Sequence, residues 1–468
     1  MVFSSVSFLY YFLPVTMALY FFTPARYQNV VLLVCSLFFY AWGEPRYIAV
    51  MGISIVSGYG FGLLVEKYRE KSSGRFWCVL SAGVSLSFLL YFKYTDFFLM
   101  NINRITGLEL PMRQRTLPAG ISFYTFQMIS YTIDVYRSEA AQKNIMHLAV
   151  YITMFPQLIA GPIVRYADIA DRLRPEAEPD HRRHTTLDAA ALGIRYFVTG
   201  LAKKILLADQ LAQLCTVFRN SGEKSVLFHW MYAVSCSLYI YFDFSGYSDM
   251  ASGLGRLFGF HFPENFKYPF ISKSMTEFWR RWHISLGTWF RDYVYIPLGG
   301  SRKGRMRQMV NIFIVWMLTG LWHGAEWNFI IWGFYFAVFI CLEKVLVIKN
   351  RILSHVYFLF FISIGFIIFH AQNLGQACAD IGGLFGAGGI PAVSDEAVYY
   401  LQSYAGLLAV AVCCAVPLVP FLADRISRLP AGRRILSGME PATLLALMVL
   451  ISAYLVDSTF HPFLYFRF

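Results

Sequence analysis

Residues 352–371 read ILSHVYFLFFISIGFIIFHA, twenty positions without a single Asp, Glu, Lys or Arg. A helix rises about 1.5 Å per residue, so about 20 apolar residues cross the roughly 30 Å hydrocarbon core of a bilayer. A second run, QNVVLLVCSLFFYAWG at 28–43, has the same character. Hydrophobic residues make up 57% of the 468 positions and charged residues 15%, whereas an ordinary soluble domain carries about 25% charged residues. The sequence therefore predicts an integral membrane protein.

The apolar runs recur along the whole chain, and they predict an all-α polytopic membrane protein with about eleven transmembrane helices plus re-entrant segments. The expected spans lie near 6–22, 28–45, 47–65, 76–92, 119–136, 145–164, 191–214, 226–247, 308–345 (two passes or a broken pair), 352–371, 399–421 and 441–457. Basic loops at 66–75, 165–184, 301–307 and 424–434 are expected in the cytoplasm, as the positive-inside rule predicts, and this places the N-terminus outside. Strict alternation of sides then fails around 119–165, where prolines favour a re-entrant segment.

The net charge of +12 does not indicate nucleic-acid binding, because the Lys and Arg residues sit in short loops between apolar spans. No polar stretch is long enough for a separate soluble domain, and no nucleotide-binding loop or internal repeat is present in the sequence. We expect one transmembrane domain over 1–468, with a catalytic core at about 119–345 and an aromatic tail at 457–468. These observations argue against a nucleotide-driven pump.

Polar residues concentrate in three apolar stretches, at 241–270, 275–300 and 318–336. An ionisable group inside a membrane costs about 2.5–3.5 kcal/mol on insertion scales, and such groups usually face a cavity or a partner. Asp243 is one of these groups in the first stretch. Three polar clusters within a hundred residues predict a shared, water-accessible cavity.

The stretch 275–300 carries two adjacent arginines, Arg280 and Arg281. If this stretch is helical, Glu277 and Arg281 lie four positions apart on one face and can form an ion pair. The planar donor fork of arginine suits an anionic ligand such as the phosphates of a donor, and interfacial snorkelling is the alternative. A Gly/Pro-rich turn follows, so we expect a helix and then a break.

His323 lies in the middle of an apolar stretch, between Gly320 and Gly324. A neutral imidazole accepts a proton from a hydroxyl and makes it nucleophilic, and the ordinary pKa of histidine suits that work. We expect the two glycines to let a substrate approach the backbone. The alternative is a hydrogen-bonded structural histidine.

A second histidine, His283, and the polar residues Asp292 and Asn328 strengthen the catalytic interpretation of His323. A zinc site built on the two histidines and a carboxylate lacks any His-x-x-x-His or cysteine pairing, so no metal is expected.

Several longer motifs resemble the membrane-bound O-acyltransferase family, in particular its bacterial alginate O-acetyltransferase branch. They are LFFYAWG at 37–43, PQLIAGPI at 156–163, DFSGYSDMA at 243–251, FPENF at 262–266, FWRRWHISL at 278–286, WFRDY at 289–293, YIPLGG at 295–300 and TGLWHG at 319–324. The resemblance covers nearly the whole chain.

The resemblance implies that His323 is the catalytic histidine and that His283 matches the family's second functional polar residue. It also implies a bowl-like helical fold with a central tunnel, into which the donor enters from the cytoplasm. The residues that we expect to bind substrate are Arg280, Arg281, Asp243, Asp292, Asn328 and Trp322.

The resemblance further implies transfer of an acetyl group onto a hydroxyl of a cell-surface polysaccharide, in the bacterial cytoplasmic (inner) membrane. The expected donor substrate is acetyl-CoA or another acyl thioester, including one on an acyl carrier, and no bound cofactor is expected. The expected partners are an extracytoplasmic SGNH-hydrolase-like acetyltransferase, the polysaccharide acceptor and membrane lipid. In the tail, Tyr465 is expected to relay the acyl group or to dock the partner, the alternative being a plain interfacial aromatic anchor.

Two other functions stay open at this point. One is D-alanyl transfer to teichoic acid within the same family, and the other is a non-enzymatic polysaccharide transporter or scaffold. A transporter would favour paired broken helices in two repeated halves, which the sequence does not show.

Overall fold

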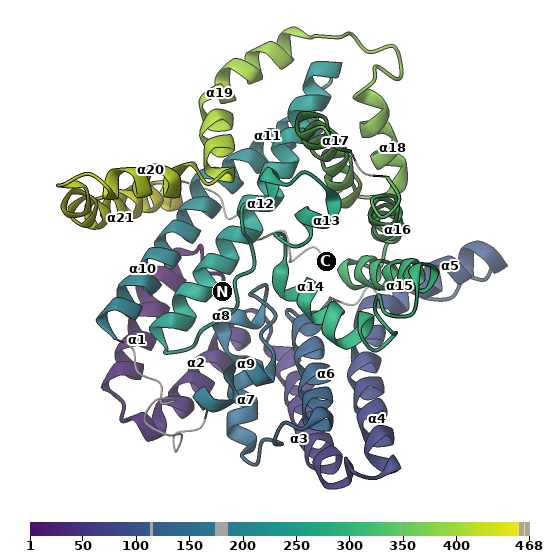
Figure 1. Ribbon diagram of the computed structural model, residues 1–468, viewed down its shortest axis with the longest axis vertical. Coiled ribbons are helices and arrows are strands. Elements are labelled where there is room, and N and C mark those ends of the chain that lie inside the picture. Colours follow the sequence, from purple (N-terminus) through teal and green to yellow (C-terminus); the bar gives the residue numbers. More distant parts are fainter. Residues whose placement is uncertain (113–115, 174–185, 347, 458–462, 464–468) are drawn as a thin grey trace. The chain divides into compact units, whose positions relative to one another are not determined.

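The computed structural model describes residues 1–112, 116–173, 186–346, 348–457 and 463, and its regular elements in these ranges are helices (Figure 1). β pairing in this described part is limited to one isolated bridge. The prediction of an all-α protein is confirmed.

The chain packs as two compact units. Unit 1 contains Met1–Phe197 and Met250–Pro263, and unit 2 contains Val198–Asp249 and the described part of Glu264–Leu464. The long helix α12 (Val226–Leu257) contributes to both, because the division falls after Asp249. The three polar stretches of the sequence belong to unit 2, apart from Met250–Pro263 in the middle of the first.

Several helical runs are long and apolar enough to cross a membrane, as expected of a membrane protein. Among the described residues there are five: Pro45–Tyr68, Ser72–Thr106, Arg351–His370, Asp395–Ala415 and Gly432–Val456. Two shorter apolar helices, Phe8–Phe22 and Trp327–Leu342, accompany them. The count of eleven transmembrane helices and the central tunnel stay predictions.

Unit 1 contains a group of mutually packed helices, α3 (Ile48–Tyr68), α4 (Ser72–Leu89) and α6 (Ile121–Arg137) (Figure 1). Helix α3 approaches α6 closely at Gly62, where a Cβ atom would lie 2.4 Å from the hydroxyl of Tyr131. Small residues allow such approaches between membrane helices, where packing rather than hydrophobicity drives association.

Unit 2 carries a consecutive series of packed helices, α15 (Arg305–His323), α16 (Trp327–Leu342) and α17 (Arg351–His370) (Figure 1). Three non-helical residues, 324–326, separate α15 from α16 directly after His323. The expectation of two passes or a broken pair over 308–345 is confirmed as a pair of helices.

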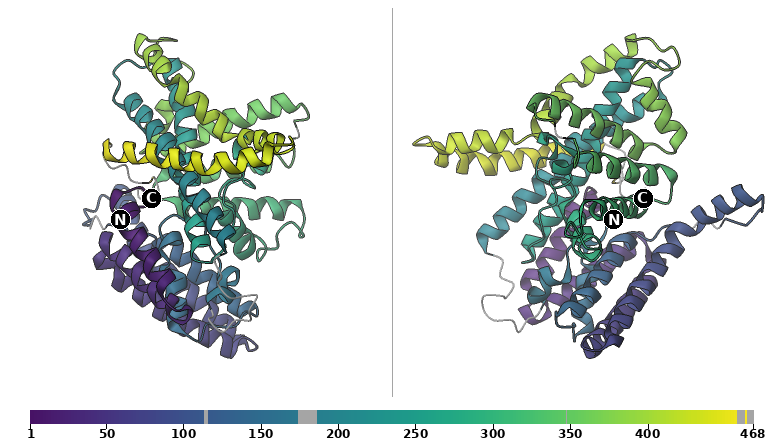
Figure 2. Two further views of the ribbon diagram at one scale, coloured as in Figure 1. Left: turned by 90° about the vertical axis from the view of Figure 1, so that its left-hand side faces the viewer. Right: turned by 45° about the vertical axis from the view of Figure 1, so that its right-hand side comes forward.

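The last two helices of the described chain, α20 (Leu418–Ser427) and α21 (Gly432–Asp457), pack against each other (Figure 2). Helix α21 contains Pro441 in its interior. Proline is tolerated in membrane helices because nearby groups re-satisfy the freed carbonyl.

The stretch 275–300, treated in the sequence as a helix followed by a break, begins with two short helices instead of one. Helix α13 covers only Met275–Phe278, and α14 begins at Ile284 and ends at Phe290. Between them, Trp282 pairs in an antiparallel bridge with Phe266, and the backbone N–H of Lys267 donates to the carbonyl of Arg281 at 2.9 Å. This pairing with a segment far along the chain overrides local helix propensity.

Candidate active site

His323 is the last residue of α15 and is only 6% exposed. Three aromatic rings surround its imidazole, with centroid distances of 4.9 Å to Trp322, 5.1 Å to Trp332 and 5.1 Å to Phe369. These rings come from α15, α16 and α17, so three helices build the pocket of one side chain. These rings and the low exposure of His323 limit the access of bulk water to the imidazole.

The backbones of α15 and α16 approach each other closely at Gly320 and Gly333. A Cβ atom on Gly320 would lie 2.4 Å from the carbonyl oxygen of Phe329, and one on Gly333 would lie 2.4 Å from that of Trp316. A Cβ on Gly324 would fall 2.2 Å from the ring of Phe329. The expectation that Gly320 and Gly324 open the backbone to substrate is therefore corrected, because both face the neighbouring helix.

This packing predicts that Gly320→Ala destabilises the protein. The new methyl group overlaps the Phe329 carbonyl, and overpacking of this kind costs about 1–3 kcal/mol. Thermal unfolding in detergent measures the effect. Gly83→Ala is the matched control, since a Cβ there meets nothing within 4 Å; an equal loss of stability in both variants contradicts the packing argument.

His283 precedes α14 and is 2% exposed. Its φ of 46° places a non-glycine residue in the left-handed region, which proteins tolerate mainly at sites with a functional constraint. The imidazole stands 4.5 Å from the Phe244 ring and 6.1 Å from the Trp322 ring. Trp322 thus contacts both histidines, and the structure brings the two predicted catalytic residues to one aromatic cluster.

A cavity of about 500 Å³ adjoins His283 in unit 2. Its lining residues are Thr276, Trp279, Arg280, Trp282, His283, Ile284, Leu286, Gly287, Thr288, Phe290, Arg291, Tyr295, Ile312, Val315, Trp316, Thr319 and Ile340. The walls are mainly apolar, and Arg280 and Arg291 are its two charged residues. Such a cavity suits an elongated ligand that carries an anionic group.

His323 does not line this cavity, and a layer of tryptophans stands between them. Trp279 and Trp316 line the cavity and lie 4.6 Å apart. Both contact Trp332, at 5.5 Å and 5.9 Å, and Trp332 contacts His323. The tryptophan layer therefore connects the cavity wall to the imidazole by direct ring contacts.

Of the predicted substrate-binding residues in 275–300, Arg280 lines the cavity, whereas Arg281 and Asp292 do not. Arg280 lines the cavity with an exposed side chain. Arg281 lies outside the lining and forms the i,i+4 ion pair with Glu277 at 3.0 Å, which confirms that expected pair. Asp292 pairs with the cavity residue Arg291 at 2.7 Å.

Asp243 has a buried partner. Its carboxylate lies 2.6 Å from the Nζ atom of Lys204, which is fully buried and also lies 2.8 Å from Asp209. Lys204 belongs to a π-helical segment, Lys203–Ala208. The two carboxylates stabilise one ammonium group in the interior, which a buried charge requires.

This cluster predicts that Lys204→Met leaves two buried carboxylates without their cation. Breaking a buried pair costs about 3–5 kcal/mol, so we expect a large loss of folded protein, measured by size-exclusion chromatography and thermal unfolding in detergent. Lys203→Met is the matched control, because its ion pair with Asp249 is about a quarter exposed and so contributes less. An equal loss of folded protein in the two variants would contradict the role of Lys204 as the buried partner of the two carboxylates.

Asn328 is fully buried and holds the end of α17. Its Nδ2 group donates to the carbonyl of Ala371 at 2.9 Å and to that of Ile368 at 3.4 Å. The ring of Phe369, between these two acceptors, packs on His323. Asn328 therefore acts on the histidine pocket through the backbone of α17.

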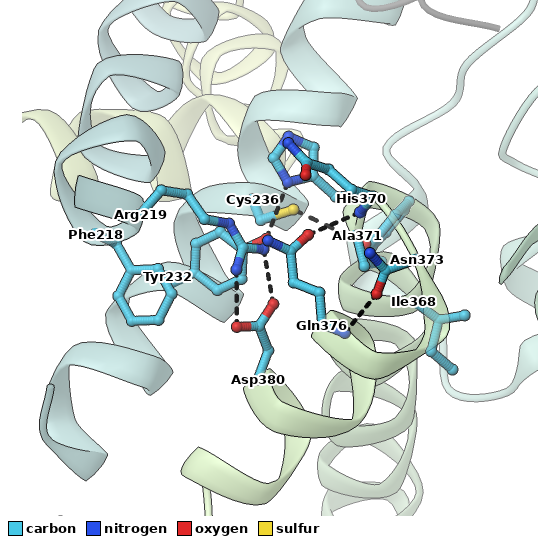
Figure 3. Close-up of polar contacts among 12 residues, drawn as sticks. Phe218, Arg219, Tyr232, Cys236, Ile368, His370, Ala371, Asn373, Gln376 and Asp380 are labelled. Atoms are coloured by element: carbon cyan, nitrogen blue, oxygen red, sulfur yellow. Dashed lines mark hydrogen bonds and ion pairs between the residues drawn. The ribbon is translucent and has the colours of Figure 1, made fainter. Parts of the chain in front are cut away.

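A polar chain holds the same helix end from another side (Figure 3). Asp380 forms an ion pair with Arg219 at 2.7 Å, and Arg219 donates to the hydroxyl of Tyr232. That hydroxyl lies 2.9 Å from Nδ1 of His370, the residue after Phe369. Sequence analysis missed this chain, since its members are spread over more than 160 positions.

Tyr465, which we expect to relay the acyl group or to dock the partner, lies outside the described residues. Phe463, two positions earlier, is 1% exposed. Its ring contacts the Tyr247 ring at 4.8 Å, and the Lys204 ammonium lies 4.4 Å from its centroid. This part of the tail packs on the buried charge cluster.

No group of three His, Cys, Asp or Glu side chains that could hold a metal ion occurs among the residues that the structure describes. The site is built from two imidazoles, arginines and aromatic rings, which suits acid–base and anion-binding chemistry.

Comparison with known proteins identifies the class. Residues 85–369 match the profile of the membrane-bound O-acyltransferase (MBOAT) family. The chain is 37% identical to the Azotobacter vinelandii protein named "Probable alginate O-acetylase AlgI", over the full length of both. It is 32% identical to the peptidoglycan O-acetyltransferase of Helicobacter pylori, over 86% of this chain and 83% of that protein. The teichoic acid D-alanyltransferase of Bacillus subtilis is 31% identical over 47% of this chain and 57% of that protein.

The chain belongs to the membrane-bound O-acyltransferase family and is an acyltransferase. The resemblance stated from its motifs is confirmed, including the similarity to alginate O-acetylases.

Proposed function

We propose that this protein transfers an acetyl group from a cytoplasmic thioester across the bacterial cytoplasmic membrane, for O-acetylation of a cell-surface polysaccharide. The observation that carries the proposal is the pair of buried histidines on Trp322 beside a 500 Å³ cavity. Full-length similarity to a protein named as an alginate O-acetylase supports acetyl as the transferred group.

In the proposed reaction His323 is the general base. Its imidazole takes the proton of the acceptor hydroxyl, and the oxygen attacks the thioester carbonyl. The C–S bond breaks, the new C–O bond completes the ester, and the imidazolium returns the proton to the departing thiolate. His283, whose ring lies 6.1 Å from that of Trp322, assists.

The cavity is the proposed site of the donor. Its apolar walls fit an extended thioester arm, and Arg280 and Arg291 fit the anionic end of acetyl-CoA or of a phosphopantetheine on an acyl carrier. The donor then reaches the tryptophan layer with its acyl end. The proposed SGNH-hydrolase-like partner completes transfer on the outer side of the membrane, with Tyr465 as its docking or relay residue.

His323→Ala tests the reaction. We expect surface O-acetylation to fall by about 10²–10⁴-fold, the usual contribution of general acid–base catalysis, while expression and membrane insertion stay unchanged. Mass spectrometry of surface glycans measures the acetyl content. His261→Ala, at an exposed histidine of unit 1, is the control and retains acetylation.

A transporter or scaffold predicts a different result, because neither needs a base at this position. Normal acetylation in the His323→Ala strain would therefore overturn the enzymatic proposal. D-alanyl transfer to teichoic acid is the second candidate reaction, favoured by the similarity to the Bacillus subtilis protein. The mass of the transferred group distinguishes acetyl from D-alanyl.

Arg280→Ala tests the donor site. We expect the KM for acetyl-CoA to rise by about tenfold, because a hydrogen bond to a charged group contributes about 1.5–3 kcal/mol. The KM is measured from the release of free CoA by the purified protein in nanodiscs at increasing acetyl-CoA concentrations. Arg281→Ala is the matched neighbour, since its side chain pairs with Glu277 outside the cavity; a larger rise in KM for Arg281→Ala contradicts the assignment.

A further inference from the structure

Asn265 lies in the loop after α12 and is 3% exposed. Its side-chain amide meets the start of α14. The Oδ1 atom lies 3.2 Å from the backbone nitrogen of Ser285, 2.9 Å from the hydroxyl of Ser285 and 3.1 Å from Nδ1 of His283. Its Nδ2 group donates to the hydroxyl of Ser248 at 2.9 Å. One buried side chain therefore collects four polar contacts around His283.

The backbone of Asn265 adds a further contact. Its carbonyl accepts the N–H of Ile284 at 3.0 Å. Asn265 thus forms hydrogen bonds to Ile284 and Ser285, the two residues after His283, through both its main chain and its side chain. These hydrogen bonds stabilise the left-handed conformation of His283, whose φ is 46°.

The orientation of the Asn265 amide follows from one of these contacts. A backbone N–H can only donate, so the atom that meets the N–H of Ser285 is the oxygen. An amide oxygen carries no hydrogen, so Nδ1 of His283 must be the donor in their contact. A neutral imidazole with a proton on Nδ1 has a bare lone pair on Nε2.

The Nε2 atom of His283 is buried and has no hydrogen-bond partner among the residues that the structure describes. A buried polar atom without a partner costs about 1–3 kcal/mol, and such atoms are rare in native proteins. His283 also lines the 500 Å³ cavity. The lone pair is therefore available to a ligand that brings a hydrogen-bond donor.

We propose that Asn265 is a positioning residue that holds His283 in its Nδ1–H tautomer, so that Nε2 accepts a hydrogen bond from an amide N–H of the thioester donor. This inference rests on the proposed function, because it assigns the donor to the cavity. It gives His283 a role distinct from that of His323: His283 binds and orients the donor, and His323 moves the proton.

The surroundings of His283 keep the imidazole neutral. Burial lowers its pKa to about 3, and the residue lies outside the candidate membrane-spanning helices. The groups packed against it, Phe244 of α12 and Trp322 of α15, carry no charge.

The charged side chains nearest in the cavity lining are those of Arg280 and Arg291, which are both cationic. His323 contacts Trp322 as well. Asp243, next to Phe244, is paired with Lys204. Among the described residues, no carboxylate contacts His283, so none favours the protonated imidazole.

Asn265→Asp tests the tautomer with a side chain of the same shape. A carboxylate beside Nδ1 favours the imidazolium and raises the pKa of His283. The protonated ring carries a hydrogen on Nε2 and can no longer accept. The hydrogen bond from the donor to Nε2 is therefore lost at low pH in this variant and is restored as the pH rises above the raised pKa of His283.

The experiment uses the full-length protein in nanodiscs, with acetyl-CoA as the probe and release of free CoA as the readout. The pH runs from about 5 to 8, the range in which proteins tend to be most stable. For Asn265→Asp we expect the KM for acetyl-CoA to rise by about tenfold at the acid end, the equivalent of one hydrogen bond, and to return towards the wild-type value at the alkaline end. The kcat at saturating acetyl-CoA changes less than KM. Ser248→Ala is the matched control, because it removes the contact of Nδ2 and leaves Oδ1 on His283, so its KM keeps the wild-type dependence on pH.

A uniform loss of activity at every pH in Asn265→Asp would overturn the proposal and leave Asn265 a purely structural residue. His283→Gln gives a second test if Asn265→Asp does not fold, because the glutamine oxygen reaches about the position of Nε2 and retains an acceptor. We expect His283→Gln to keep a lower KM than His283→Ala, and equal KM values would overturn the acceptor role. Failure of the proposed function is distinguishable, since the wild-type protein would then release no CoA at all.

Discussion

The site depends on the direct contact between α15 and α16. Gly320 and Gly333 let the two backbones touch, and this close packing brings the end of α15 against the start of α16. His323 ends one helix, and Trp332 on the other helix contacts its ring. In a membrane, close van der Waals packing of this kind supplies the association that the hydrophobic effect cannot supply between apolar helices. The position of His323, the proposed base, therefore depends on these two glycines.

Two cationic side chains of unit 2 are held by ion pairs. Lys204 is paired with two aspartates, and Arg219 with Asp380. Because unpaired charge inside a low-dielectric interior is very costly, these pairs act as rigid connections between segments that are distant along the chain. The chain from Asp380 to His370 fixes the end of α17, and with it the ring of Phe369 on His323.

The tryptophan layer gives the chemistry its dry environment. Trp279 and Trp316 form part of the cavity wall, and Trp332 joins them to the His323 pocket. Aromatic rings pack edge to face at distances of about 4.5–7 Å, and the observed contacts lie in this range. The thioester of the proposed donor would be shielded from water at such a layer, which favours transfer to a hydroxyl over hydrolysis.

The amino-acid sequence by itself determined the membrane character, the all-helical class, the break between α15 and α16, and the family. Apolar runs about 20 residues long have few alternatives to a helix in lipid, and the motifs around His283 and His323 are long. Only the tertiary structure decided what surrounds these residues. The stretch that begins at Met275 is interrupted where Arg281 and Trp282 pair with Phe266 and Lys267. The glycines beside His323 serve helix packing, and Asp243 neutralises Lys204. The role inferred for Asn265 also needed the fold, because a hydrogen bond across 18 positions of irregular chain leaves no periodic pattern in the sequence.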